Sequence, residues 1–439
     1  MSSQPSPQLA PEASGDLGVP AFDRHRAWLV TALIVTFMVV NFADKSVLGL
    51  AAGPIMDELD ISHSTYGLIS SSYSVLFSLS GLVVGFFSSR LSSRVLLFAM
   101  CLVWGLAQLP VLIVATVPTL VAGRLLLGAA EGPATPMSMH ALYKWFPVGR
   151  RGLPSALQIS GAALGTLVAA PVVTWLITQF GWRSAFAVLA VVSLVWSSVW
   201  WFLGHDGPYD DKPAAESQAG PDGQARVPYR RLLLCGTVVG SVASAFGASW
   251  AMAVSHAWLP SYLGTQLSMS PGAAASVISA VSAFSFVLLL ALSPAVDRLT
   301  RRGASLRWSS GVPQGVAVVC AGTAMALIPV SGATSVQLVL IAVAFGAHSI
   351  AFPLHYMTAA AVAPASQRGA LFGIVAATGT LPGLLAPSIT GRLLDTASSQ
   401  GAGYAQSFAL AAAVMIGCGV VAACCINPAR DAARLKSAA

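Results

Sequence analysis

The sequence predicts an all-α membrane protein whose twelve transmembrane helices form two lobes of six. Three observations support this fold class. First, 56% of the 439 residues are apolar and only 9% are charged, whereas about 25% of the residues in soluble domains are charged. Second, twelve apolar stretches are each long enough to cross a hydrocarbon core of about 30 Å. Third, the second half of the chain repeats parts of the first half.

The twelve stretches are expected to be helices. A membrane barrel would show short segments of alternating apolar and polar residues, which this sequence lacks. An open sheet cannot pair its backbone groups in lipid. The predicted spans cover residues 27–50, 65–88, 95–115, 118–140, 153–179, 183–203, 232–263, 272–294, 308–330, 336–360, 369–393 and 404–426.

An internal repeat and a central polar stretch indicate two halves. A shift of 217 residues (368 − 151) places Arg151-Gly152 on Arg368-Gly369 and Pro136 on Pro353. Residues 204–231 lie between the halves and have the composition of a linker. Same-direction repeats of six helices are typical of two-lobed secondary transporters, which open a midplane site to each side in turn.

The basic residues predict the orientation, because Lys and Arg in short loops are retained on the cytoplasmic side. With the N-terminus inside, only Arg183 and Arg392 of the 23 basic residues fall on the outer side, at the ends of spans, and only Lys45 and Arg124 fall deeper inside spans. The net charge of +7 therefore reflects topology and contact with lipid head groups, and not nucleic-acid binding. We expect a multi-pass protein of a bacterial inner membrane with both termini cytoplasmic.

Five regions follow from these spans and loops. They are a disordered cytoplasmic tail at 1–26, an N-terminal lobe at 27–203, a cytoplasmic linker at 204–231, a C-terminal lobe at 232–426 and a cytoplasmic tail at 427–439.

The sequence offers little that would support catalysis or metal binding. The six cysteines lie in or beside apolar segments without metal-like spacing, so we expect them to pack as small apolar residues. There is no phosphate-binding glycine loop and no Ser-His-Asp arrangement. We expect no enzyme activity and no cofactor.

Four ionisable residues lie inside predicted spans: Asp44 and Lys45 in the first, Arg124 and Glu131 in the fourth. Each costs about 2.5 to 3.5 kcal/mol at the bilayer centre on insertion scales, and such residues usually face a substrate or ion path. Arg124 and Glu131, seven apart, share nearly one helix face, whereas Asp44 and Lys45 diverge by about 100°. Each residue of the adjacent pair must therefore find a partner elsewhere, either Asp44 with Arg124 or Lys45 with Glu131.

Several motifs surround these charges. They are Asn41-Phe-Ala-Asp44-Lys45, Gly128-Ala-Ala-Glu131-Gly-Pro133-Ala-Thr-Pro136, Lys144-Trp-Phe-Pro147, Arg150-Arg-Gly152, Gly161-Ala-Ala-Leu-Gly165 and Phe180-Gly-Trp-Arg183. Together they resemble the major facilitator superfamily over about residues 27–426, and within it the anion:cation symporter branch of proton-coupled organic-anion transporters. The resemblance implies that Asp44 and Glu131 are proton-linked acids and that Arg124 matches the branch's helix-four arginine. Lys45 stands where arginine is common.

The loop after the second span resembles the superfamily's gate motif, with departures. It reads Gly85-Phe-Phe-Ser-Ser89-Arg90-Leu-Ser92-Ser-Arg94, so serines replace the acid and a glycine. The second copy, Asp297-Arg298-Leu-Thr-Arg-Arg302, keeps its acid. The resemblance implies gating roles for Arg90, Arg94, Asp297 and Arg298, with a weaker latch in the first half. Anchoring by positive charge on the cytoplasmic side is the alternative for Arg90 and Arg94.

The second half has no acidic residue, lysine or arginine at the midplane. His348 falls on Glu131 under the 217-residue shift, and His355 lies two turns further along. A neutral histidine can donate a hydrogen bond to an anion, although it can equally join two helices. The candidate substrate-binding residues are Lys45, Arg124, Phe42, Tyr73, Phe77, His348, His355 and Thr380.

A coupling scheme follows from the charges. Burial favours the neutral form of a carboxyl group, whereas a nearby cation favours the charged form. An anion that occupies Lys45 or Arg124 would remove the counter-ion of Asp44 or Glu131 and raise that acid's affinity for a proton.

We therefore expect a monomer that imports a small organic anion, a carboxylate or sulfonate, by proton symport through alternating access. Phe42, Phe77, Ala162 and Ala376 make the expected pocket less polar than a sugar-acid site. A fixed charge network that only joins helices, a proton-coupled efflux antiporter and a sodium-coupled carrier are the alternatives.

Overall fold

The computed structural model describes residues 23–87, 92–147, 150–209, 227–364 and 367–436, with a few helix side chains left aside. Nearly all of these residues are helical, and no strand occurs among them. Most of the predicted N-terminal tail and residues 210–226 of the predicted linker lie outside the described residues.

The described residues of the first half form eight α-helices. They are α1 (Arg24–Leu50), α2 (Ala52–Leu59), α3 (His63–Phe87), α4 (Ser93–Ile113), α5 (Val117–Glu131), α6 (Ala134–Tyr143), α7 (Gly152–Phe180) and α8 (Trp182–Leu203).

In the second half, the elements given for the described residues are nine α-helices and two short helical segments of other types. They are α9 (Tyr229–Leu233), α10 (Gly236–Thr265), α11 (Pro271–Arg301), the π-helix η3 (Arg307–Gly311), α12 (Val312–Leu327), α13 (Thr334–Gly346), the 3-10 helix η4 (Ala347–Ile350), α14 (Ala351–Ala360), α15 (Arg368–Thr396), α16 (Gln400–Cys425) and α17 (Pro428–Lys436). Helix α17 lies in the predicted C-terminal tail.

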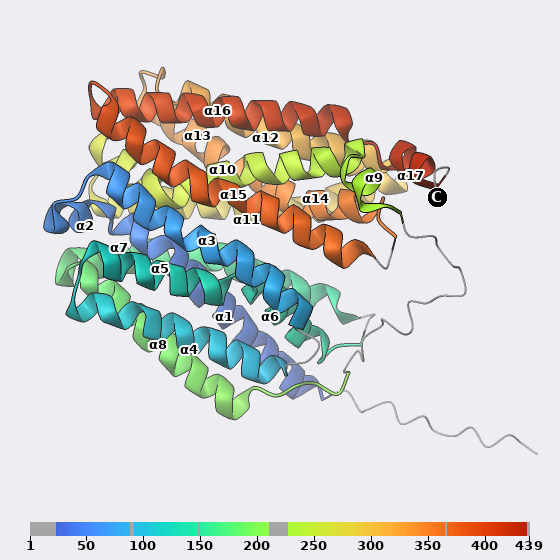
Figure 1. Cartoon of the computed structure of the whole chain (residues 1–439), viewed down its shortest axis with the longest axis horizontal. Helices are drawn as coiled ribbons and strands as arrows, with labels where there is room; N and C mark the ends of the chain where they lie inside the picture. The colour runs from blue at the N-terminus through green and yellow to red at the C-terminus, as the bar shows by residue number, and fades with distance from the viewer. Residues whose placement is uncertain (1–22, 88–91, 148–149, 210–226, 365–366, 437–439) are drawn as a thin grey trace, which may run out of the picture.

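Within the described ranges, ten helical segments are long and apolar enough to cross a membrane. Helix α3 and the pair α5–α6 account for the two other predicted spans, so each of the twelve corresponds to a helix or to consecutive helices. The predicted fold class is confirmed. Figure 1 shows α1–α8 as one bundle and α9–α17 as a second bundle above it, with α2 at the left end and α9 and α17 at the right end.

Short polar side chains cap several helices, because the first N–H groups of a helix have no partner within it. The Asp23 carboxylate accepts from the Arg26 N–H at the start of α1. The Ser92 hydroxyl accepts from the Val95 N–H at the start of α4. The serine that replaces the glycine of the gate motif is therefore a helix cap.

Two spans are interrupted at matching positions of the two halves. The fourth span changes from α5 to α6 at Gly132 and Pro133, and the tenth passes from α13 through η4 to α14. Glu131 is the last residue of α5 and His348 lies in η4, and these are the residues that the 217-residue shift (348 − 131) superimposes. Irregular backbone at membrane depth is tolerated where it is buried in protein or lines a cavity.

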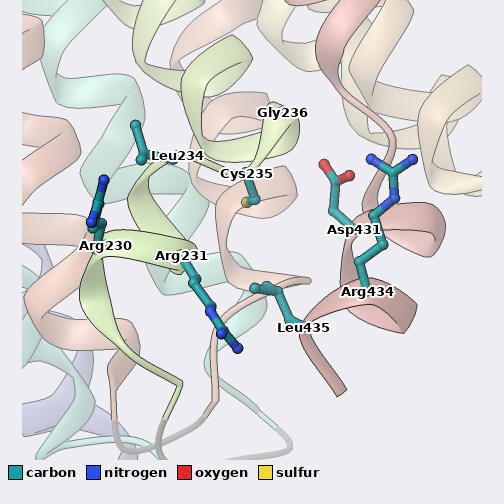
Figure 2. A pocket seen from close by; sticks show the side chains of 8 residues that line it. All are labelled: Arg230, Arg231, Leu234, Cys235, Gly236, Asp431, Arg434 and Leu435. Carbon is teal, nitrogen blue, oxygen red and sulfur yellow. The ribbon is translucent and has the colours of Figure 1, made fainter. Parts of the chain in front are cut away.

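A carboxylate holds α17 against the start of α10. Asp431 is buried, and it accepts hydrogen bonds of 2.7 Å from the N–H and the hydroxyl of Thr237 and one of 2.8 Å from Arg430 Nε. Burial opposes its ionisation, but these hydrogen bonds outweigh it and hold the pKa of Asp431 below its usual value. A pocket of about 440 Å³ adjoins this contact and is lined also by Arg230, Arg231 and Arg434 (Figure 2).

Close packing of α3 on α15 joins the two bundles. A Cβ atom on Gly67 would lie 2.5 Å from the carbonyl oxygen of Pro387, and one on Gly391 would lie 2.3 Å from that of His63. Both distances are too short for any side chain, so glycine is required at these crossings. The pairs α7–α11 and α1–α10 add further contacts between the bundles.

The hydrogen bonds between α3 and α15 are concentrated toward the α2 end of the molecule. Ser388 donates to Ser71 Oγ at 2.8 Å, and Ser78 Oγ lies 2.5 Å from Thr380 Oγ1. Beyond Ser78, the described side chains of α3 make no hydrogen bond to α15. The structure is therefore a conformation closed at the α2 end.

Asp395, near the end of α15, caps α3 across the interface between the bundles. Its carboxylate accepts from the backbone N–H groups of His63 (3.1 Å) and Ser64 (2.7 Å) and from the Ser64 hydroxyl. Nδ1 of His63 lies 2.9 Å from the same carboxylate. Because a helix N-terminus favours negative charge, this cap stabilises the closed α2 end.

The Asp395→Ala variant is expected to open the α2 end more often. A hydrogen bond to a charged group contributes about 1.5 to 3 kcal/mol, so the loss of one bond shifts the equilibrium about 10-fold or more. Double electron–electron resonance between spin labels at the ends of α3 and α15 would show the shift as a change in the distribution of distances. The matched control is Glu58→Ala, which removes a carboxylate bonded to Trp182 and Arg183 within one bundle. Equal distance distributions in the two variants would contradict the role of Asp395.

Candidate functional site

The four charged residues predicted from the sequence lie near one another in the first bundle. Asp44 is fully buried, and Glu131 and Arg124 are 1% and 6% exposed. The Lys45 side chain keeps 14% of its surface exposed, so its ammonium is the most accessible of the four groups.

Lys45 and Glu131 form one of the two pairings that the sequence left open. Lys45 Nζ lies 3.7 Å from Glu131 Oε2 and donates a 2.7 Å hydrogen bond to Asn41 Oδ1. The Tyr73 hydroxyl donates to the same Glu131 oxygen at 2.6 Å. Glu131 Oε2 is therefore surrounded by groups that stabilise an ionised carboxylate.

Two phenyl rings flank the Lys45 ammonium. Its Nζ lies 4.2 Å from the centre of the Phe42 ring and 5.3 Å from that of Phe77. Cation–π contacts of this kind contribute about 0.5 to 2 kcal/mol, more where water is excluded. The predicted residues Phe42, Phe77 and Tyr73 thus contact the charged residues directly.

Asp44 and Arg124 do not pair through their side chains. Asp44 turns toward α4, where Gln108 Nε2 donates to its Oδ1 at 3.1 Å. Arg124 Nη1 reaches only the backbone carbonyl of Asp44, at 3.5 Å, and the guanidinium lies 5.5 Å from the Tyr73 ring centre. Among the described residues, no carboxylate oxygen lies within 4.0 Å of this guanidinium. Asp44 thus points toward α4 within its own bundle.

Glycines on α5 bring the aromatic residues of α3 to the site. A Cβ atom on Gly128 would lie 2.0 Å from the Tyr73 carbonyl oxygen, and one on Gly132 would lie 2.2 Å from that of Phe77. Small residues four apart let two membrane helices approach closely. The Gly128-x-x-x-Gly132 spacing therefore sets the position of Tyr73 and Phe77 against Glu131.

The predicted residues of the second bundle have other surroundings. His348 is buried in the break of the tenth span, its Nδ1 has no partner among the described residues, and its ring lies 5.9 Å from that of Phe352. Nδ1 of His355 lies 2.9 Å from the Ala351 carbonyl oxygen, so a helix backbone group uses that nitrogen. Thr380 meets Ser78 across the interface.

The predicted gate residues are only partly described. Arg90 lies outside the described residues, and so does the side chain of Asp297. Arg94 packs on Trp201, with 5.1 Å from its Cζ to the ring centre, and donates to the Trp201 carbonyl. Arg298 is exposed in the last turn of α11. The described contacts of Arg94 therefore stay within the first bundle.

Two amides and one histidine near the charges are absent from the predicted site residues. Asn41 binds Lys45, and Gln108 binds Asp44. His256 on α10 lies close enough to interact electrostatically with Lys45 and Arg124. A polar amide in an otherwise apolar span was the available signal for Gln108, since a buried amide needs partners.

Removing one partner of the Lys45–Glu131 pair should destabilise the protein more than removing both. A buried ion pair that loses one member costs about 3 to 5 kcal/mol, because the other charge stays buried without compensation. We expect Lys45→Met to lower the thermal unfolding temperature in detergent, and Lys45→Met/Glu131→Gln to recover much of the loss. Additive losses in the double variant would show that the two side chains are not coupled.

Comparison with known proteins agrees with this architecture. The model of the Major Facilitator Superfamily matches residues 34–387. The chain is 26% identical over 368 residues to a hexuronate transporter of Bacillus subtilis, covering 81% of this chain and 85% of the relative. It is 28% identical over 245 residues to a probable sulfoacetate transporter of Cupriavidus necator, covering 54% and 56%.

A solved D-xylose–proton symporter superimposes with a TM-score of 0.75 at 14% identity, over 92% of this chain and 99% of that one. At this identity the likeness shows the fold alone. Together with the family match, it agrees with the resemblance noted in the motifs. The chain therefore belongs to the Major Facilitator Superfamily, a family of membrane transporters and not of enzymes, and within it matches the anion:cation symporter branch.

Proposed function

We propose that this protein imports a small organic anion together with a proton, by alternating access in a bacterial inner membrane. The observation that carries the proposal is an imbalance among the buried charges. Of the two cations, Lys45 is paired with Glu131, whereas the Arg124 guanidinium has no carboxylate within 4.0 Å among the described residues. A buried guanidinium whose donors lack an anionic partner is suited to bind one.

The accessible ammonium of Lys45 supports the same anion site. It is held by Asn41 and the two phenyl rings as well as by Glu131, so an incoming carboxylate or sulfonate can replace Glu131 without leaving the ammonium unsupported. The apolar rings of Phe42 and Phe77 favour an anion with few hydroxyl groups. The names of the relatives, a hexuronate and a probable sulfoacetate transporter, agree with small organic anions as the substrate class.

Proton coupling follows from the displacement of Glu131. Once the anion holds Lys45, the Glu131 carboxylate loses its nearest cation while it remains buried. It also sits at the carboxyl end of α5, where the helix dipole disfavours negative charge. Protonation of Glu131 then accompanies anion binding, so neither is carried alone.

The conformation fits alternating access. Because positive charge marks the cytoplasmic side, the α2 end is the outer end, and the Asp395 cap closes it. Rocking of the bundles would break this cap and open the anion site outward.

The variant Glu131→Gln is expected to exchange anion across the membrane while losing proton-driven accumulation, because a permanently neutral side chain needs no proton. Proteoliposomes with an imposed pH gradient would measure both activities. If the variant concentrated the anion as well as the parent does, the proton role of Glu131 would be wrong.

The variants Lys45→Ala and Arg124→Ala are expected to weaken anion binding by about 10- to 150-fold each, the range for a charge-assisted hydrogen bond of about 1.5 to 3 kcal/mol. Thermal-shift titrations of purified protein with a panel of carboxylates and sulfonates would identify the ligand and then measure the loss. Arg183→Ala removes an arginine at the α2 end and serves as the control. Unchanged affinity in both site variants would contradict the proposed anion site.

A further inference from the structure

Asp44 and Gln108 make one of the two hydrogen bonds that a carboxylic acid and an amide can form with each other. Gln108 Nε2 donates to Asp44 Oδ1 at 3.1 Å, and both side chains are at most 1% exposed. The two remaining polar atoms, Asp44 Oδ2 and Gln108 Oε1, are buried and have no hydrogen-bond partner among the described residues. Both atoms are hydrogen-bond acceptors, so two buried oxygens lack a hydrogen-bond donor.

One proton supplies the missing donor. A neutral carboxylic acid and a primary amide form two parallel hydrogen bonds, with amide N–H to carboxyl C=O and carboxyl O–H to amide C=O. The first of these bonds is present, and the second would use the two unpartnered atoms. Each buried acceptor left without a partner costs about 1 to 3 kcal/mol, so a proton on Oδ2 relieves both costs at once.

The charged surroundings of Asp44 give an ionised carboxylate little support. The titratable groups that face it are Lys45 on its own helix, Tyr73 on α3, Cys101 on α4, and Arg124 and Glu131 on α5. The ammonium of Lys45 is directed to Glu131, and Arg124 contacts only the Asp44 backbone carbonyl. No cationic nitrogen among the described residues lies within 4.0 Å of the Asp44 carboxylate.

A water molecule is a poorer explanation of these atoms. A cavity of about 10 Å³ lies beside Gln108 and Arg124, at the lower limit for one water. Asp44 is not among the residues that line it. Water there would serve Gln108 Oε1 and leave Asp44 Oδ2 without a partner.

We propose that Gln108 is a positioning residue that holds Asp44 as a neutral acid in the conformation closed at the α2 end, while Glu131 is ionised against Lys45. The two acids of the site thus carry opposite protonation states, set by an amide on one side and an ammonium on the other. This inference rests on the proposed function for its part in transport, because the proton held by Gln108 and Asp44 is one that symport can carry.

Infrared spectroscopy of the purified protein in lipid nanodiscs tests the proposal without transport. At neutral pH and without anion, we expect a carboxylic-acid C=O band that disappears in Asp44→Asn. In Gln108→Met, which keeps the side-chain length but removes both amide groups, the band should move to higher wavenumber because the carbonyl loses its N–H donor. The matched control is Gln314→Met, since Gln314 is a buried glutamine of the second bundle that donates to Thr358 and also has an unpartnered Oε1.

Two results would overturn the proposal. A spectrum unchanged by Asp44→Asn would show that Asp44 is ionised, and a band at the same position in Gln108→Met and the parent would show that Gln108 is not its partner. If Gln108→Met does not fold, solid-state NMR of the parent gives the same answer, from the carboxyl carbon shift of Asp44 and its dipolar contact with the Gln108 amide nitrogen. Proteoliposomes that show no proton coupling, beside an intact Asp44 band, would refute the proposed function alone.

Discussion

The cost of placing charge in lipid governs this structure. Lys45 and Glu131 lie where an isolated charge would cost about 2.5 to 3.5 kcal/mol, and the 3.7 Å contact between them offsets that cost in this conformation. Tyr73 donates a hydrogen bond to Glu131, and Asn41 and two phenyl rings contact the Lys45 ammonium. Under the proposed function, an anion that competes for the ammonium would change the protonation or the position of Glu131, so the contact that stabilises the pair would also couple the anion to the proton.

Helix α3 packs closely on a neighbouring helix in two places, once at the site and once between the bundles. Within the first bundle, Gly128 and Gly132 let α3 press its Tyr73 and Phe77 against α5. Between the bundles, Gly67 and Gly391 let the half of the same helix nearest α2 pack on α15, where Asp395 caps it. Helix α3 thus carries site residues and also packs on α15 at the α2 end.

The repeat in the sequence has a structural counterpart at the helix breaks. The 217-residue shift that superimposes Glu131 on His348 also superimposes the interruption of the fourth span on that of the tenth. Pro133 stands at the first break, but a proline in a membrane helix can be accommodated as a kink or as an end, so the sequence left the form of the break open. The gate motif was harder to interpret, since Ser92 caps a helix and the described contacts of Arg94 stay within its own bundle.

The sequence by itself determined the apolar spans, their helical type and which residues carry the site's charge, because apolar length and charge in lipid are properties of each segment alone. It also established that Asp44 and Lys45 point apart, since helix geometry separates adjacent residues by about 100°. Only the tertiary structure decided the partners. Lys45 rather than Arg124 holds a carboxylate, and Asp44 turns to Gln108, because partner choice depends on which helices meet at that depth.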